Sequence, residues 1–220
     1  MVINCVIFDL DGVLVDSIMA WIEAYKETFR KFGLDFPDLK KLKIIMWATD
    51  RELIDRFLPR DFENREEKIQ QIERYLFITM ERFIPTSYIR QQEGSKKLLE
   101  ALKQRNKKLD IVTNSDRRLV DRIMHRFELH KFFDVIVTKN DVRMTKPHPD
   151  PILQAAKKLG CKPNAILYIG DSEIDIIAGK AAGVMTAMFK PLTRKESFEP
   201  RTTPDYVLNK LEEILPLLEK

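Results

Sequence analysis

Five short apolar runs limit the folds that are open to this 220-residue chain. They occupy residues 2–8, 109–112, 135–137, 165–169 and 184–189. Runs of this length suit strands that are buried on both faces of a parallel sheet. Segments with helical spacing of apolar residues lie between them, and alternation of strand and helix is typical of an α/β protein. We therefore predict a doubly wound parallel sheet.

A long helical segment, residues 17–90, follows the first apolar run and shows no clear strand pattern. Aromatic side chains recur there at helical spacing, at Trp21, Tyr25, Phe29 and Phe32. Thr49 and Glu52 have the spacing of a capping box and predict the start of another helix. A crossover between parallel strands needs only about a dozen residues. Because the segment is much longer than a crossover requires, we predict that residues 17–90 form an inserted helical cap domain. The core domain would then comprise residues 1–16 and 91–220, and the cap would cover the carboxyl edge of the sheet.

Charge and composition argue against several classes of partner. The chain has 38 Lys and Arg against 34 Asp and Glu, and its net charge of +4 is spread along the sequence, which does not favour nucleic-acid binding. No run approaches the roughly 18 apolar residues of a membrane span. Asp9 and Asp11 interrupt the N-terminal run, so it does not resemble a signal peptide. We expect a cytoplasmic protein without membrane contact, with a monomer as the default. Cys5 and Cys161 lack metal-ligand spacing, and we expect both to be structural thiols.

Polar residues follow the predicted strands at the edge where parallel sheets bind ligands. The four groups are Asp9 with Asp11, Thr113 with Asn114 and Ser115, Lys146 alone, and Asp171 with Asp175. Each group by itself has a simpler explanation. Residues 113–115 could cap a helix, Asp171 could begin one, and Asp175 could be a surface acid. Four such groups in loops that the fold brings together favour a functional site.

The chemistry of these groups suits a phosphoryl substrate. Asp9 and Asp11 share a face of an extended strand and repel each other unless a cation compensates. Carboxylates are ligands for Mg²⁺, whereas a lysine and a hydroxyl neutralise anionic oxygens. We therefore expect Mg²⁺ on Asp9 and Asp171, with Asp175 touching a ligand water.

The order of the motifs resembles that of the haloacid dehalogenase-like hydrolase superfamily. The segments that carry the resemblance are DLDGVLVDS, VTNS, KPHPDP and GDSEIDIIAGKAAG, and they span most of the chain. The resemblance is closest to the phosphatase branch with a helical cap inserted after the first motif, which includes phosphoglycolate phosphatases and beta-phosphoglucomutases. It implies a Rossmann-like core with that cap.

The resemblance also implies a role for each acidic residue. Asp9 would be the nucleophile that forms an aspartyl phosphate, and Asp11 would be the general acid and base. Mg²⁺ would be held by Asp9, Asp171 and the backbone carbonyl of Asp11, with Asp175 as the second acid of the last motif. A dehalogenase would not need a proton donor at Asp11, so this residue favours phosphate chemistry.

Other motif residues would contact the phosphoryl group. Lys146, the Thr113 hydroxyl and the backbone N–H of Asn114 would neutralise its oxygens. Ser115 either contacts phosphate or caps the following helix, and Gly12 keeps the turn after the first strand small.

The cap loop departs from the family pattern, because residues 45–49 lack the glycine that relatives often have there. Trp47 and Arg51 are candidates for substrate contact, although a cap-core aromatic residue and a surface cation are the simpler interpretations. Asp110 interrupts the second apolar run, as an edge strand or a surface ion pair would.

We therefore predict a Mg²⁺-dependent phosphatase that hydrolyses a small phosphorylated metabolite, of the phosphoglycolate or sugar phosphate type. A phosphosugar mutase would use the same catalytic residues and is the main alternative. A regulatory receiver domain would be shorter and would lack the inserted cap. A non-catalytic phosphate-binding protein would be expected to have lost a carboxylate or the lysine.

Overall fold

A computed structural model describes residues 2–36, 49–60, 62–191 and 201–218. The chain divides into two compact units. Residues Met1–Asp16 and Gln91–Lys220 form an α/β unit, and residues Ser17–Arg90 form a helical unit. Among the described residues, no helix combines the length and the apolar character that a membrane span requires.

A six-stranded sheet is the framework of the α/β unit, with strand order β5-β4-β1-β6-β7-β8. The strands are β1 (Cys5–Phe8), β4 (Lys108–Val112), β5 (Val135–Val137), β6 (Ile166–Gly170), β7 (Met185–Phe189) and β8 (Tyr206–Leu208). Every neighbouring pair is parallel. The predicted parallel α/β fold is therefore confirmed.

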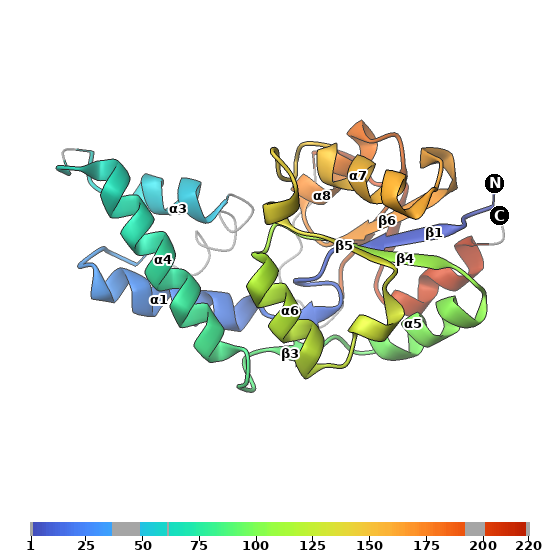
Figure 1. The fold of residues 1–220 in the computed structure, drawn as a ribbon, viewed down its shortest axis with the longest axis horizontal. Coiled ribbons are helices and arrows are strands. Elements are labelled where there is room, and N and C mark those ends of the chain that lie inside the picture. The colour runs from blue at the N-terminus through green and yellow to red at the C-terminus, as the bar shows by residue number, and fades with distance from the viewer. Residues whose placement is uncertain (1, 37–48, 61, 192–200, 219–220) are drawn as a thin grey trace. The chain divides into compact units, whose positions relative to one another are not determined.

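Helices cover both faces of this sheet. They are α5 (Ser95–Gln104), α6 (Arg117–Arg126), α7 (Asp150–Leu159) and α8 (Glu173–Ala181), with 3-10 turns at His130–Phe132, Lys139–Asp141, Pro163–Ala165 and Leu211–Leu217. Helix α7 packs on β4 and β5 and α8 packs on β6 and β7, whereas α5 lies on the opposite side of the sheet (Figure 1). Ile7, Val112 and Ile152 belong to the apolar core under α7 and α8, which excludes water from the strands on that side.

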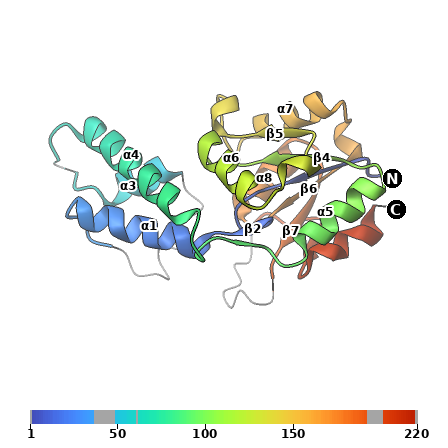
Figure 2. The ribbon, with the colours of Figure 1, turned by 60° about the horizontal axis from the view of Figure 1, so that its bottom comes forward.

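Three helices form the described part of the helical unit (Figure 2). They are α1 (Ile18–Lys31), α3 (Asp50–Phe57) and α4 (Arg65–Phe83), and both α1 and α3 pack against α4. Phe29 is fully buried and makes edge-to-face contacts with Tyr25 and Phe57, which accounts for the aromatic spacing along α1. The predicted capping box is present, since the Thr49 hydroxyl accepts a hydrogen bond from the Glu52 backbone at the start of α3.

Two short strands were missed by the sequence analysis. Strands β2 (Val15–Asp16) and β3 (Arg90–Gln91) form a two-stranded sheet. Each contains only two residues, which is too short for an apolar alternation to be recognised.

Asp110 lies in β4, between β1 and β5, and is fully buried. The prediction of an edge strand or a surface ion pair is therefore wrong. Within the described part of the chain, neither carboxylate oxygen of Asp110 has a hydrogen-bond partner. Burial raises the pKa of this carboxyl to about 8, although the Lys158 ammonium opposes the shift.

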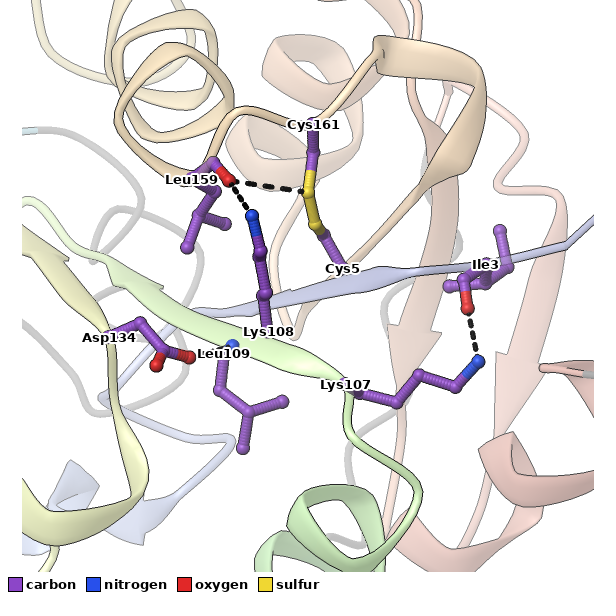
Figure 3. The surroundings of a disulfide bond; sticks show 8 residues. All are labelled: Ile3, Cys5, Lys107, Lys108, Leu109, Asp134, Leu159 and Cys161. Atoms are coloured by element: carbon purple, nitrogen blue, oxygen red, sulfur yellow. Dashed lines mark hydrogen bonds between the residues drawn. A yellow bond between two sulfur atoms is a disulfide. The ribbon is translucent and has the colours of Figure 1, made fainter.

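Cys5 and Cys161 form a disulfide, with their Cα atoms 6.5 Å apart (Figure 3). The prediction of two thiols is therefore wrong. The bond joins β1 to the segment that follows α7, across 156 residues of sequence. In the same region, Lys108 donates a hydrogen bond of 2.5 Å to the backbone carbonyl of Leu159, the last residue of α7 (Figure 3). No local spacing predicts a pairing over such a distance, because only the packing of α7 on the sheet brings the two cysteines together.

Candidate active site

Strand register brings three of the predicted polar groups to one edge of the sheet. Phe8 of β1 pairs with Ile111 of β4 on one side and with Ile169 of β6 on the other. The three strands therefore end at nearly the same level, and Asp9, Thr113 and Asp171 are the residues that directly follow them. Strand β1 is where the chain order of the sheet reverses, and open α/β sheets bind their ligands at this point.

Lys146 is the centre of the charged cluster at this edge, and only 2% of its surface is exposed. Its Nζ atom lies 2.6 Å from Asp175 Oδ1 and 2.9 Å from Asp9 Oδ1. It also contacts the Val112 carbonyl oxygen at 3.2 Å and the Tyr168 hydroxyl at 3.0 Å. Burial works against the charged form, but the two carboxylates hold the pKa of Lys146 above its usual value. A cation is therefore fixed beside the predicted nucleophile.

The side chain of Asn114 holds the backbone of Lys146 in place. Its Nδ2 donates to the Lys146 carbonyl at 2.9 Å, and its Oδ1 accepts from the Lys146 N–H at 3.0 Å. This two-way bond fastens the loop before α7 to the end of β4. The sequence analysis assigned only the Asn114 backbone to the site, so this use of the side chain was missed.

Asp175 is fully buried, which excludes the interpretation as a surface acid. Besides Lys146, it accepts hydrogen bonds from the Tyr168 hydroxyl at 2.7 Å and from the Ser172 backbone and hydroxyl. Burial opposes ionisation, but Lys146 and these hydrogen bonds hold the pKa of Asp175 below its usual value. A Cβ atom at Gly170 would lie 2.2 Å from the Asp175 Cβ, so the glycine makes room for this carboxylate.

Asp9, Asp171 and Asp175 each offer a carboxylate oxygen within 4.8 Å of the others. Burial raises the pKa of Asp9 well above its usual range, and Lys146 opposes this shift. The neighbouring carboxylates of Asp175, Asp171 and Asp11 raise it further. Three acidic side chains lie close together and one lysine pairs with two of them, which leaves an excess of negative charge that a bound cation would offset.

The predicted polar group at residues 113–115, after β4, does not cap helix α6. Asp116 is the N-cap of α6 and accepts a hydrogen bond from the Arg118 N–H at 3.0 Å. Ser115 instead donates its hydroxyl hydrogen to Asp11 Oδ2 at 2.6 Å, and the Thr113 hydroxyl accepts from the Ser115 N–H. The structure thus ties the predicted acid and base, Asp11, to the end of a second strand.

Gly12 follows this acid and has a φ of 82°, in the left-handed region where a glycine is favoured. Its N–H donates to the Val15 carbonyl at 2.7 Å and closes the turn after β1.

Of the two predicted residues of the helical unit, only Arg51 belongs to the described part of the chain. Arg51 is exposed on α3 and forms ion pairs with Glu66 and with Glu73, the latter at 3.6 Å. These pairs account for its position on the surface of its own unit. Trp47 lies outside the described residues, so its substrate contact stays a prediction.

Three residues of the cluster were given no role by sequence reasoning. Tyr168 is within an apolar strand and looked like a core residue, although a buried tyrosine generally needs a partner for its hydroxyl. Ser172 and Asp175 have capping-box spacing at the start of α8, and this signal could have found Ser172. Gly170 directly precedes Asp171, but only the packing of the Asp175 side chain over it shows why a glycine stands there.

The chain is similar to several known proteins. A family model described as haloacid dehalogenase-like hydrolase matches residues 6–189. A protein named pyrophosphatase PpaX from Bacillus cereus strain AH820 is 30% identical over 218 residues, which cover 99% of this chain and 97% of that protein.

Solved structures show the same fold. A haloacid dehalogenase-like family hydrolase from Streptococcus pneumoniae is 25% identical, with a TM-score of 0.81 and 98% of each chain covered. CbbY from Rhodobacter sphaeroides, solved in complex with phosphate, is 24% identical, with a TM-score of 0.83 and with 99% of this chain and 100% of that chain covered. This chain is a member of the haloacid dehalogenase-like hydrolase family.

Proposed function

We propose that this hydrolase is a Mg²⁺-dependent phosphatase that acts on small phosphomonoesters. The observation that carries the proposal is the contact of Asp9 with Lys146, 2.9 Å apart, beside a cluster of further carboxylates where the sheet reverses its strand order. Such a site combines a nucleophile with positive charge for the oxygens of a phosphoryl group.

Asp9 is the proposed nucleophile. One of its carboxylate oxygens attacks phosphorus in line with the ester oxygen, the P–O bond to the substrate breaks, and Asp11 protonates the leaving oxygen. Asp11 then takes a proton from a water molecule, which attacks phosphorus and releases Asp9 and inorganic phosphate. The hydrogen bond from Ser115 to Asp11 Oδ2 supports this role, because it orients the carboxyl group that must move both protons.

Lys146, the Thr113 hydroxyl and the Asn114 N–H are the proposed binding groups for the phosphoryl oxygens. The Lys146 ammonium is already held by the Val112 carbonyl and the Tyr168 hydroxyl. It therefore needs little reorientation when negative charge develops on the phosphoryl oxygens. Thr113 is 3% exposed and lies at the end of β4, next to the strand that carries Asp9.

The donor set fits Mg²⁺, since Asp9, Asp171 and Asp175 present hard oxygen ligands within 4.8 Å of one another. Asp9 and Asp171 are the proposed direct ligands together with the Asp11 carbonyl. Asp175 uses its oxygens for Lys146, Tyr168 and Ser172, which supports the more distant role through a water. When bound, the ion would neutralise charge between an anionic nucleophile and an anionic substrate.

The proposed partner is a small phosphorylated metabolite in the cytoplasm, with residues 17–90 acting as the cap that selects it. Several Bacillus relatives at 30% identity are named pyrophosphatase PpaX, which favours inorganic pyrophosphate as a second candidate substrate. A phosphosugar mutase would share Asp9 and Asp11 and would differ in the lifetime of the phosphorylated aspartate.

The test is phosphate release from phosphoglycolate, sugar phosphates and pyrophosphate with Mg²⁺. We expect turnover that is lost with a chelator and in Asp9→Asn, and kept in Asp35→Asn, which changes an exposed acid of the helical unit. Mass spectrometry of acid-quenched enzyme should find the phosphoryl group on Asp9. Full turnover by Asp9→Asn would contradict the assignment of Asp9 as the nucleophile. Turnover without a divalent cation would contradict the requirement for Mg²⁺. Turnover restricted to pyrophosphate would select the second candidate.

A further inference from the structure

Tyr168 is a residue of the cluster that takes no chemical step in the proposed reaction. It lies on β6, is fully buried, and places its hydroxyl 3.0 Å from Lys146 Nζ and 2.7 Å from Asp175 Oδ1. An ammonium group can only donate hydrogen bonds and an ionised carboxylate can only accept them. The hydroxyl therefore accepts from Lys146 and donates to Asp175, so both of its roles are defined by its partners.

The Lys146 ammonium has three N–H groups and four oxygen partners at 3.2 Å or less. Two of these oxygens belong to the carboxylates of Asp9 and Asp175, which attract the charge strongly. The other two, from Tyr168 and the Val112 carbonyl, are neutral. Neutral acceptors hold the ammonium in position without cancelling its charge, which stays available for an anionic ligand.

The ring of Tyr168 is held as firmly as its hydroxyl. It belongs to the apolar core under α7 and α8, and Gly179 of α8 passes so close that a Cβ there would lie 3.3 Å from the Tyr168 ring. The Lys146 ammonium lies 5.8 Å from the centre of the ring. A side chain that is packed in this way presents its hydroxyl at a constant place relative to Lys146.

We propose that Tyr168 is a positioning residue, whose hydroxyl holds the Lys146 ammonium where it meets the phosphoryl oxygens in the transition state. This inference rests on the proposed phosphatase function and extends it to a residue that makes no contact with substrate. Without the hydroxyl, the ammonium keeps the Val112 carbonyl as its one neutral partner among the four described, and the two carboxylates draw it further toward Asp175 and Asp9. A shift of a charged group by a fraction of an ångström is costly when charge develops on the transferred group.

The variant Tyr168→Phe keeps the ring and removes only the hydroxyl. We expect kcat to fall about tenfold, with a change of KM below about threefold, because the interaction counts most in the transition state. Binding of orthovanadate, which imitates the transferred phosphoryl group, should weaken about tenfold, whereas binding of inorganic phosphate should change less than about threefold. Both affinities are measured by thermal shift with Mg²⁺, without turnover.

Tyr25→Phe is the matched control. Tyr25 is also buried, and its hydroxyl lies 2.5 Å from Asp50 Oδ1 within the helical unit. Both variants lose a buried hydroxyl that donates to an aspartate, and Tyr168→Phe also loses the hydrogen bond accepted from Lys146. The unfolding temperature should therefore fall by a few degrees in both variants, and at least as far in Tyr168→Phe. Tyr25→Phe should keep kcat and vanadate affinity within about twofold of wild type.

The wild-type measurements separate the two proposals. If wild type turns over phosphomonoesters and Tyr168→Phe matches it in kcat and vanadate affinity, the positioning role is overturned and the phosphatase stands. If wild type binds vanadate and phosphate without turnover, the phosphatase fails, while a selective loss of vanadate binding in Tyr168→Phe still supports the role of the hydroxyl. Wild type without turnover or anion binding overturns both.

Discussion

Two buried aspartates of the α/β unit, Asp175 and Asp110, show how differently the same side chain behaves at equal burial. Both are fully buried. Asp175 accepts hydrogen bonds from Lys146, Tyr168 and Ser172, whereas neither oxygen of Asp110 has a partner among the described residues. The pKa of Asp175 is held below its usual value, and burial raises that of Asp110 to about 8.

The difference teaches that partners, rather than depth, set the cost of a buried carboxylate. Desolvation is the largest influence on both groups and disfavours the ionised form in each. At Asp175 a cation and three hydrogen-bond donors overcome it. At Asp110 the Lys158 ammonium, which is exposed, opposes the effect of burial and does not overcome it. Asp110 is therefore expected to be neutral at neutral pH, and Asp175 to be charged.

The largest effect is expected from Lys146→Met, which removes the cation that pairs with Asp175 and Asp9. The change leaves Asp9 and Asp175 buried without their cation, and the free energy of unfolding near pH 7 should fall by about 3–5 kcal/mol. Turnover should fall at least about 10³-fold, because the charge beside the phosphoryl group is lost. Urea denaturation and phosphate release measure the two effects.

The control for this variant is Lys157→Met, which removes an exposed lysine of α7 and should change stability by less than about 0.5 kcal/mol. Adding Asp175→Asn to Lys146→Met should recover part of the lost stability, because one unpaired charge is then removed. If Lys146→Met unfolds within about 1 kcal/mol of wild type, the buried charges are not coupled as described.

A substitution at Asp110 should change stability in the opposite direction, raising the free energy of unfolding instead of lowering it. Asp110 has a pKa of about 8 in the folded chain against 3.8 for an ordinary aspartate. The folded state therefore keeps a proton that the unfolded state loses, and this group lowers stability progressively as the pH rises from 3.8 to about 8, with the full penalty above that range. Asp110→Asn should remove this pH dependence and be more stable than wild type by about 2–4 kcal/mol near pH 9, with little difference near pH 4.

Urea denaturation over this pH range measures the effect, and Asp35→Asn, an exposed change, should reproduce the wild-type profile. A wild-type profile that Asp110→Asn leaves unaltered would show that Asp110 is ionised in the folded protein at little cost. It would also remove the contrast with Asp175.

The smallest effect is expected from removing one hydrogen bond to Asp175, the bond that the Ser172 hydroxyl donates. Ser172→Ala removes the hydroxyl that caps α8 and bonds to Asp175, and should cost about 1–2 kcal/mol because the carboxylate is buried. Thr49→Ala removes the corresponding hydroxyl from the exposed capping box of α3 and should cost about 0.5–1 kcal/mol. Thermal unfolding compares them, and an equal loss would mean that burial adds nothing to the cap of α8.

Much of the fold could be predicted because its signals are local. The apolar runs became β1, β4, β5, β6 and β7 to within a few residues, and the helical spacing around Phe29 became α1. Parallel strands that end in polar residues bring those residues together, so the cluster around Asp9 could be anticipated as well. The roles of its members and those of Trp47 and Arg51 stay predictions.

The sequence by itself determined the α/β pattern and the polar residues at the strand ends, since periodicity and motif spacing are properties of short windows. Only the tertiary structure decided which side chains meet. It joined Cys5 to Cys161 and set the Tyr168 hydroxyl between Lys146 and Asp175. It also buried Asp110 where, in the described part of the chain, its carboxylate oxygens have no hydrogen-bond partner. The physical reason is that the partner of a buried group depends on strand register and helix packing between segments far apart in the chain, which no local pattern encodes.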